Sequence, residues 1–201
     1  ANWHNAFLTG LVPLAVAVIA VFVLTESESW KKNKQAPAES NHLSKKLFAP
    51  AYRKNLLTGS LIFGAMLIGL WAVFSWAPTW IQSISSDAAV AQEQRGLAMM
   101  ILAGSGLAGS IISGWIVNAI GLRKTMMMCF AVCFIMTFIV FKLNNSVSAF
   151  TFIEMSVLGI FFGISQGALS VYIPQLFPTV VRASATGFCF NIGRLFTATV
   201  D

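Results

Sequence analysis

A single arginine lies in the middle of the apolar stretch GFCFNIGRLFTATV, residues 187–200. No acidic residue within that stretch neutralises Arg194. On a helix with 3.6 residues per turn, Arg194 shares one narrow stripe with Gly187, Asn191 and Ala198. Because a charge among apolar side chains must be compensated, this stripe should face a wet cavity, an anionic ligand or a neighbouring helix. Arg194 and Asn191 are therefore candidates for binding an anion. The alternative is that carbonyls and the asparagine hold Arg194 for packing alone.

Other polar or aromatic residues of the apolar stretches could also bind a solute or carry a proton. Gln166 falls on the same helical face as Gly159 and Gly163, where a cavity could form. Trp71 lies deeper in its stretch than the two tryptophans that follow it and could stack on a solute. Glu154 is the carboxylate within a long apolar stretch and is the candidate for proton coupling. Its side chain projects nearly opposite the glycine face, so an anchoring role near the membrane interface is the alternative.

Signatures of metalloproteases, ATPases and metal sites are missing from the sequence. It contains no HExxH or GxxxxGK[ST] segment, which argues against a metalloprotease or an ATPase. His4 and His42 lie outside the apolar stretches, and Cys129, Cys133 and Cys189 lie within them. We expect these cysteines to be packing residues and not a disulfide framework. The chain is expected not to be an enzyme and to hold no metal or cofactor.

The elements that must position these residues are membrane-spanning helices. The chain is 57% hydrophobic and 10% charged, whereas soluble domains carry about 25% charged residues. Six apolar runs, each near the roughly 20 residues that cross a bilayer, cover residues 7–25, 57–82, 97–120, 126–143, 148–174 and 185–200. They lack the alternation of barrel strands. An all-α, polytopic transmembrane helical bundle is predicted.

The positive charges alternate between loops and so define the topology. Between the first two runs lie Lys31, Lys32, Lys34, Lys45, Lys46, Arg53 and Lys54. Further basic residues follow the third and fifth runs, while the intervening loops carry few. This is the positive-inside pattern, which places the basic loops in the cytoplasm of a multi-pass protein of the plasma (inner) membrane. The net charge of +6 is thereby explained by the membrane, and no nucleic-acid partner is expected.

This topology puts Arg194 near the middle of the bilayer. Counted from a cytoplasmic start near Arg182, it lies about 18 Å along the helix at ~1.5 Å per residue. Insertion scales put an arginine at such a depth at roughly 2.5–3.5 kcal/mol. A cavity, an anion or a neighbouring helix has to offset that cost.

Small residues recur along two of the predicted helices. Stripes of this kind let helix backbones approach closely inside a membrane. We expect them to be packing faces, formed by Gly106, Ser110, Ser113 and Gly114 in one helix and by Gly159, Gly163 and Gly167, with Ser170 beside them, in the other.

Three segments together resemble the major facilitator superfamily. GWIVNAIGLRK, residues 114–124, resembles its Gly-x-x-x-(Asp/Asn)-x-x-Gly-x-(Arg/Lys) cytoplasmic loop. YIPQLFPTVVRASATGFCFNIGR, residues 172–194, is similar to the end of its tenth and the start of its eleventh helix, and LTESESW, residues 24–30, to the segment after its sixth. GLWAVFSWAPTW, residues 69–80, looks like the organic-acid and sialate-type symporters more than the hexose carriers. The resemblance covers the whole chain as about helices six to eleven of twelve.

The resemblance implies three regions and a partner. Residues 1–25 would be the last helix of an N-terminal bundle, 26–56 a cytoplasmic central loop, and 57–201 an incomplete, five-helix C-terminal bundle. The rest of the N-terminal bundle would belong to the same protein. Two such bundles would rock about a site at mid-membrane and expose it alternately to each side. In the family's eleventh helix the matching segment borders that central cavity, which would place Arg194 and Asn191 there.

The resemblance also implies a cytoplasmic latch that closes the inner gate. The residues at the matching positions are the bases Arg123, Lys124 and Arg182, the acid Glu26, and the amides Asn118 and Gln175. The two amides stand where the family pattern has acids, so they lose charge-assisted hydrogen bonds, which are about twice as strong as neutral ones. We expect a latch weaker than the family pattern, which depends on Glu26.

Together these features predict a secondary active transporter of a small organic solute. An organic anion is expected because of Arg194, and proton coupling and alternating access are implied by the resemblance. Its partners would be the solute, protons, the lipid bilayer and the missing bundle. The alternatives are a sugar porter, a drug exporter, or a membrane sensor with the same fold that binds a solute without carrying it.

Overall fold

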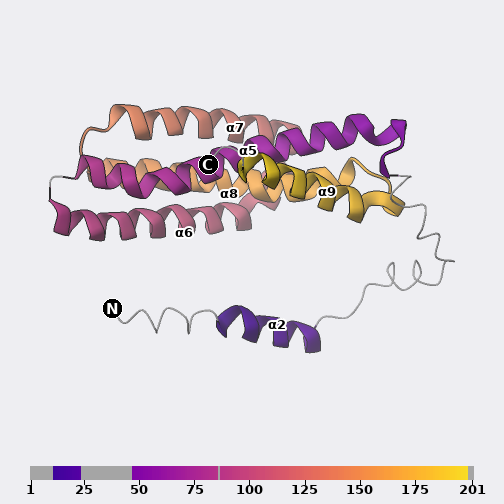
Figure 1. The fold of residues 1–201 in the computed structure, drawn as a ribbon, viewed down its shortest axis with the longest axis horizontal. Helices are drawn as coiled ribbons and strands as arrows, with labels where there is room; N and C mark the ends of the chain where they lie inside the picture. The colour runs from indigo at the N-terminus through magenta and orange to yellow at the C-terminus, as the bar shows by residue number, and fades with distance from the viewer. Residues whose placement is uncertain (1–10, 24–46, 86, 199–201) are drawn as a thin grey trace. The chain divides into compact units, whose positions relative to one another are not determined.

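The computed structural model describes residues 11–23, 47–85 and 87–198 (Figure 1). The chain divides into two compact units, residues 1–42 and 43–201. In the first unit the described element is the apolar helix α2 (Leu11–Val23), which lies inside the first predicted span. Glu26 lies outside the described residues, as does most of the predicted loop 26–56.

The second unit is a bundle of long helices that run alongside one another (Figure 1). They are α5 (Pro50–Ile84), α6 (Ala88–Ile120), α7 (Leu122–Phe138) with the π-helical turn η2 (Ile139–Leu143), α8 (Ala149–Gln175) and α9 (Thr179–Ala198). The described residues contain no strand. The predicted all-α bundle is confirmed.

Four helices of the described residues are long and apolar enough to cross a membrane: α5, α6, α7 with η2, and α8. Two of the six predicted spans do not reach both this length and this hydropathy in the described residues. α2 is apolar but has 13 described residues, whereas α9 is long enough, with 20 residues, but less apolar because it carries both Arg182 and Arg194.

Two helices begin earlier than the apolar runs predict. α5 starts at Pro50 and not at residue 57, so the last residues of the predicted loop 26–56 are helical. Proline suits a first helical position because it has no N–H to leave unpaired. Asn55 Nδ2 donates to the carbonyl oxygen of Leu176 at 2.8 Å, which ties the polar start of α5 to the end of α8. α6 starts at Ala88 because the carboxylate of Asp87 accepts a bond from the N–H of Ala89 at 2.9 Å.

α6 and α7 are joined by one residue, Gly121. Its φ of +86° lies in the left-handed region that favours glycine. Its N–H donates to the carbonyl oxygen of Val117 at 2.9 Å, and its carbonyl accepts from Thr125 Oγ1 at 3.0 Å. The resulting sharp reversal holds the motif of residues 114–124 at one end of the bundle.

The predicted small-residue stripes form the interface of α6 and α8. A Cβ added at Gly163 would collide with the carbonyl of Gly106, and one added at Gly109 would collide with the carbonyl of Ile160. The stripe expected on α6 is wrong in one member: Gly114 is exposed, and no atom lies within 4 Å of a Cβ built there. Gly109, which the sequence analysis did not single out, contacts α8 instead. The three cysteines are free and buried, as expected.

α6 and α8 run parallel. This direction follows from the register of their contacts, in which Gly159 lies against Ser105, Gly163 against Gly106 and Ser110, and Gly167 against Ser113. The turns that follow α6 and α8 therefore lie at the same end of the bundle, where α5 also begins (Figure 1).

Candidate functional site

A cavity of about 430 Å³ lies among four helices, α5, α6, α8 and α9. Its size is within the range of small-molecule sites, about 300–1,000 Å³. The wall is mostly apolar, with a few polar side chains. It consists of Phe63, Leu67, Leu70, Trp71 and Phe74 from α5, Leu102, Ala103, Gly106 and Ser110 from α6, Gly159, Phe162, Gly163 and Gln166 from α8, and Arg194 from α9.

Three of the four predicted binding residues line this cavity. Trp71, Gln166 and Arg194 come from three different helices, and all three side chains are exposed. They therefore present one indole, one amide and one guanidinium at the open side of the cavity. This combination can contact an apolar surface, a hydrogen-bonding group and an anionic group of one small molecule.

The fourth predicted residue, Asn191, is placed differently. Its Nδ2 donates to the carbonyl oxygen of Gly187 at 2.8 Å, one turn back on the same helix. It is exposed but is not among the residues that line the cavity. The amide of Asn191 is thus engaged with the backbone of α9 beside the site.

Gly193 is a positioning residue that the sequence analysis missed. A Cβ at this glycine would lie 2.8 Å from Cδ1 of Phe63 and 3.2 Å from the backbone nitrogen of Gly64. The missing side chain lets α9 approach α5, where Phe190 also stacks on Phe63 with ring centroids 4.3 Å apart. This close approach holds Arg194, the next residue, at the cavity. The signal in the sequence was a glycine next to the single arginine of the apolar run 185–200.

Glu154 lies away from the cavity, at the connection between α7 and α8. Its Oε2 accepts a bond from Asn144 Nδ2 at 2.6 Å. The same nitrogen donates to the carbonyl oxygen of Val140 in η2 at 3.1 Å, and Thr151 Oγ1 donates to Asn144 Oδ1 at 3.2 Å. The amide of Asn144 therefore ties the π-helical turn to the first turns of α8, with Glu154 as one of its partners.

The predicted latch residues lie around two turns at the same end of the bundle. Asn118, Arg123 and Lys124 are exposed on either side of Gly121. Gln175 is exposed at the end of α8, and Arg182 Nε donates to the carbonyl oxygen of Phe177 at 3.2 Å. Among the described residues no carboxylate pairs with these three cations. The acid predicted to meet them, Glu26, lies outside the described part of the chain.

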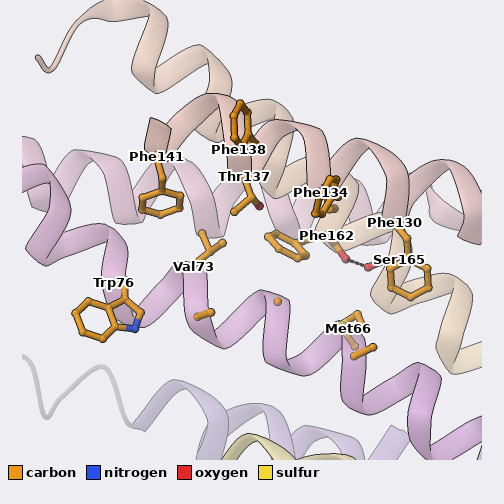
Figure 2. Close-up of a pocket in the computed structure, with 14 residues that line it drawn as sticks. Met66, Val73, Trp76, Phe130, Phe134, Thr137, Phe138, Phe141, Phe162 and Ser165 are labelled. Atoms are coloured by element: carbon orange, nitrogen blue, oxygen red, sulfur yellow. Dashed lines mark hydrogen bonds between the residues drawn. The ribbon is translucent and has the colours of Figure 1, made fainter. Parts of the chain in front are cut away.

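A second, larger cavity of about 560 Å³ lies between α5, α7 with η2, and α8, and the sequence analysis did not predict it. Figure 2 shows aromatic rings along its wall, among them Phe130, Phe134, Phe138 and Phe141. Trp76, one of the two tryptophans that follow Trp71 in α5, lines this cavity. Its polar lining includes the Ser165 hydroxyl, which already donates to the carbonyl of Phe162 at 2.7 Å. None of its lining side chains is charged, so it offers no partner for an ionic solute.

The chain matches a family model and several curated proteins along almost its whole length. The family model of the Major Facilitator Superfamily matches residues 1–198. A cis,cis-muconate transport protein of Acinetobacter baylyi is 24% identical over 98% of this chain and 48% of its own length. A probable 4-methylmuconolactone transporter of Cupriavidus pinatubonensis is 24% identical over 96% of the chain and 44% of its own length. The sialic acid transporter NanX of Escherichia coli is 26% identical over 96% of the chain and 46% of its own length.

The chain spans about half the length of the curated relatives it matches. No solved structure gives a significant match. The family model covers almost the whole chain, and four described helices have the length and hydropathy of membrane spans. The chain therefore belongs to the Major Facilitator Superfamily and is part of a polytopic integral membrane protein.

Proposed function

We propose that this chain forms part of a secondary active transporter that carries a small organic anion across the plasma (inner) membrane by alternating access. The observation that carries the proposal is the common position of Trp71, Gln166 and Arg194 at one cavity. Two of the relatives are named for transport of an acid or its anion, muconate and sialic acid. The remaining helices of the protein would supply the opposite wall of the site.

Arg194 is the residue that favours an anion over a neutral solute. Its guanidinium carries five N–H donors in a rigid, planar fork that matches a carboxylate with two parallel bonds. In a cavity within the membrane such charge-assisted bonds are short and strong. A neutral sugar cannot form such a charge-assisted pair with the guanidinium. The larger cavity has no charged side chain, so it does not fit this solute.

The proposed mechanism needs a gate at the cytoplasmic end of the bundle. We propose that Asn118, Arg123, Lys124, Gln175 and Arg182 form it together with Glu26. Their positions around the α6–α7 and α8–α9 turns support this assignment, because both turns lie at the same end. Closing the gate would require these residues to meet acids from another part of the protein.

Proton coupling is the further part of the proposal, with Glu154 as the candidate carrier. This carboxylate lies within one of the described spans and accepts a hydrogen bond from Asn144 at 2.6 Å. Protonation would weaken that charge-assisted bond and so loosen the connection between η2 and α8. This linkage would couple the protonation of Glu154 to the packing of α7 on α8.

Counterflow in proteoliposomes tests the transport proposal. The full-length protein would be loaded with muconate, sialic acid or glucose and offered the same labelled compound outside. We expect exchange of an acid and none of glucose. Arg194→Gln should abolish the exchange, and Arg194→Lys should retain part of it. Lys142→Gln, which removes an exposed cation at the other end of the bundle, is the control and should exchange normally.

The same assay separates the alternatives. Exchange of glucose at normal affinity in the Arg194→Gln variant would indicate a sugar porter and overturn the anion assignment. Saturable binding of an acid with no exchange would indicate a sensor and not a carrier.

A further inference from the structure

The wall that this chain contributes to the cavity has few groups that can hydrogen-bond a solute. The hydroxyl of Ser110 has one proton, and it is directed at the carbonyl oxygens of Gly106, at 3.0 Å, and Gly163, at 3.2 Å. Ser110 is therefore occupied as a donor by the α6–α8 interface. Gln166 supplies the side-chain amide of the wall and Arg194 its guanidinium.

The rest of the wall is aromatic or aliphatic. Phe63 and Phe162 are buried, and they form the floor of the cavity. Trp71 is 52% exposed although it belongs to a membrane-spanning helix, and Phe74 lies one turn away from it along α5. An exposed indole beside a cavity offers a flat apolar face on which a second π system can stack.

We infer that the solute is a planar, conjugated or aromatic carboxylate, and that Trp71 and Gln166 select it over polyhydroxylated acids. The inference rests on the proposed function and specifies the chemistry of its substrate. The carboxylate meets Arg194, the flat ring or chain lies against Trp71, and one further polar substituent meets the amide of Gln166. A sugar acid would bring several hydroxyl groups to a wall with one amide, and hydroxyls left without partners in a site reduce affinity strongly.

The test uses the full-length protein in proteoliposomes with labelled benzoate as the transported probe. Two unlabelled competitors separate the effect of the π system from the effect of added hydroxyl groups. Cyclohexanecarboxylate has the same ring size and charge as benzoate but no π system, and glucuronate has the same charge and several hydroxyls. Aromatic pairing is worth up to about tenfold in affinity. We expect unlabelled benzoate to compete about tenfold better than cyclohexanecarboxylate, and glucuronate to compete less than either.

Variants then assign the selectivity to named residues. Trp71→Leu should remove the preference for benzoate over cyclohexanecarboxylate, and Trp71→Phe should keep most of it. Trp76→Leu is the matched control, because Trp76 is a comparably exposed tryptophan of the same helix that lines the other cavity. It should leave the preference unchanged. 4-Hydroxybenzoate has one further polar substituent that can meet the amide of Gln166, so it should compete better than benzoate in the wild type. Gln166→Leu should remove that advantage.

The outcomes distinguish this inference from the proposed function. Preferred uptake of glucuronate, abolished by Arg194→Gln, would overturn the planar-substrate inference and leave anion transport intact. The inference would also be overturned if Trp71→Leu reduced the apparent affinity for all three acids equally, since the indole would then have no selective role. Absence of any anion uptake would overturn the proposed function itself. Should Trp71→Leu fail to fold, the wild-type competition series and Trp71→Phe still decide.

Discussion

The hydroxyl of Ser110 donates to the carbonyl oxygen of Gly163 at 3.2 Å, across the interface of α6 and α8. The bond is possible because neither helix has a large side chain between them. A Cβ at Gly163 would collide with the carbonyl of Gly106. In a membrane, where no hydrophobic effect drives helices together, this close packing and its hydrogen bond hold the pair.

Gly163→Ala should therefore destabilise the protein. The added methyl group meets backbone atoms that cannot move aside, and overpacking of this kind costs about 1–3 kcal/mol. Thermal denaturation of the full-length protein in detergent should show a lower midpoint. Gly104→Ala is the control, since no atom lies within 4 Å of a Cβ built there. It should leave the midpoint unchanged or raise it slightly, because alanine favours helix over glycine. Equal midpoints for both variants would contradict the packing role of Gly163.

Gly193→Ala should weaken anion binding more than it weakens folding. Its Cβ would approach the ring of Phe63 and the backbone of Gly64, so α9 must move away from α5. That shift displaces the neighbouring Arg194 from the cavity by a fraction of an ångström. We expect a several-fold rise in the KM of acid uptake with the protein still folded. Gly187→Ala on the same helix, where a Cβ meets nothing within 4 Å, should transport normally. An unchanged KM in Gly193→Ala would refute the positioning role.

The sequence predicted the site residues one at a time but not the cavity they share. Helical periodicity placed Arg194 on the stripe of Asn191 and Gln166 on the glycine face of its helix, because each of those predictions needs one helix only. Trp71 was placed deep in its span by its position along the apolar run. Their meeting depends on the register and tilt between helices, which no single helix encodes. Gly193 was missed for the same reason: whether a glycine lies in a contact depends on the partner helix.

The hydropathy pattern also could not predict where the helices end or that the turn η2 forms. Hydropathy marks the part of a helix that lies in lipid, whereas α5 begins at Pro50 and α6 at Ala88 in polar segments outside the apolar runs. The π-helical turn has no residue signature of its own, and it is held by Asn144 from the following loop. Gly114 was wrongly assigned to the packing face because it lies at the edge of the stripe, where a small rotation of α6 decides its exposure.

Restoring the acids of the family pattern should strengthen the cytoplasmic latch. Asn118→Asp and Gln175→Glu together place two carboxylates at the end of the bundle that carries Arg123 and Lys124. Charge-assisted bonds are about twice as strong as those of the amides, so the inward-open population should fall and transport should slow. Spin labels across the cytoplasmic gate of the full-length protein measure that population. Asn145→Asp, at the opposite end of the bundle, is the control. A distance distribution that stays unchanged in the double variant would count against the latch.

Glu154→Gln separates two roles of this carboxylate: the proposed proton carrier, and the hydrogen-bond partner of Asn144 that connects η2 to α8. The amide oxygen of glutamine can still accept the bond from Asn144, so the connection between η2 and α8 should hold and the thermal midpoint should stay near that of the wild type. The amide cannot bind a proton at physiological pH. Accumulation driven by a pH gradient should therefore be lost while counterflow, which needs no net proton movement, continues. If accumulation persists in Glu154→Gln but the midpoint falls in Glu154→Ala, the residue fastens α7 to α8 and the coupled proton is carried elsewhere.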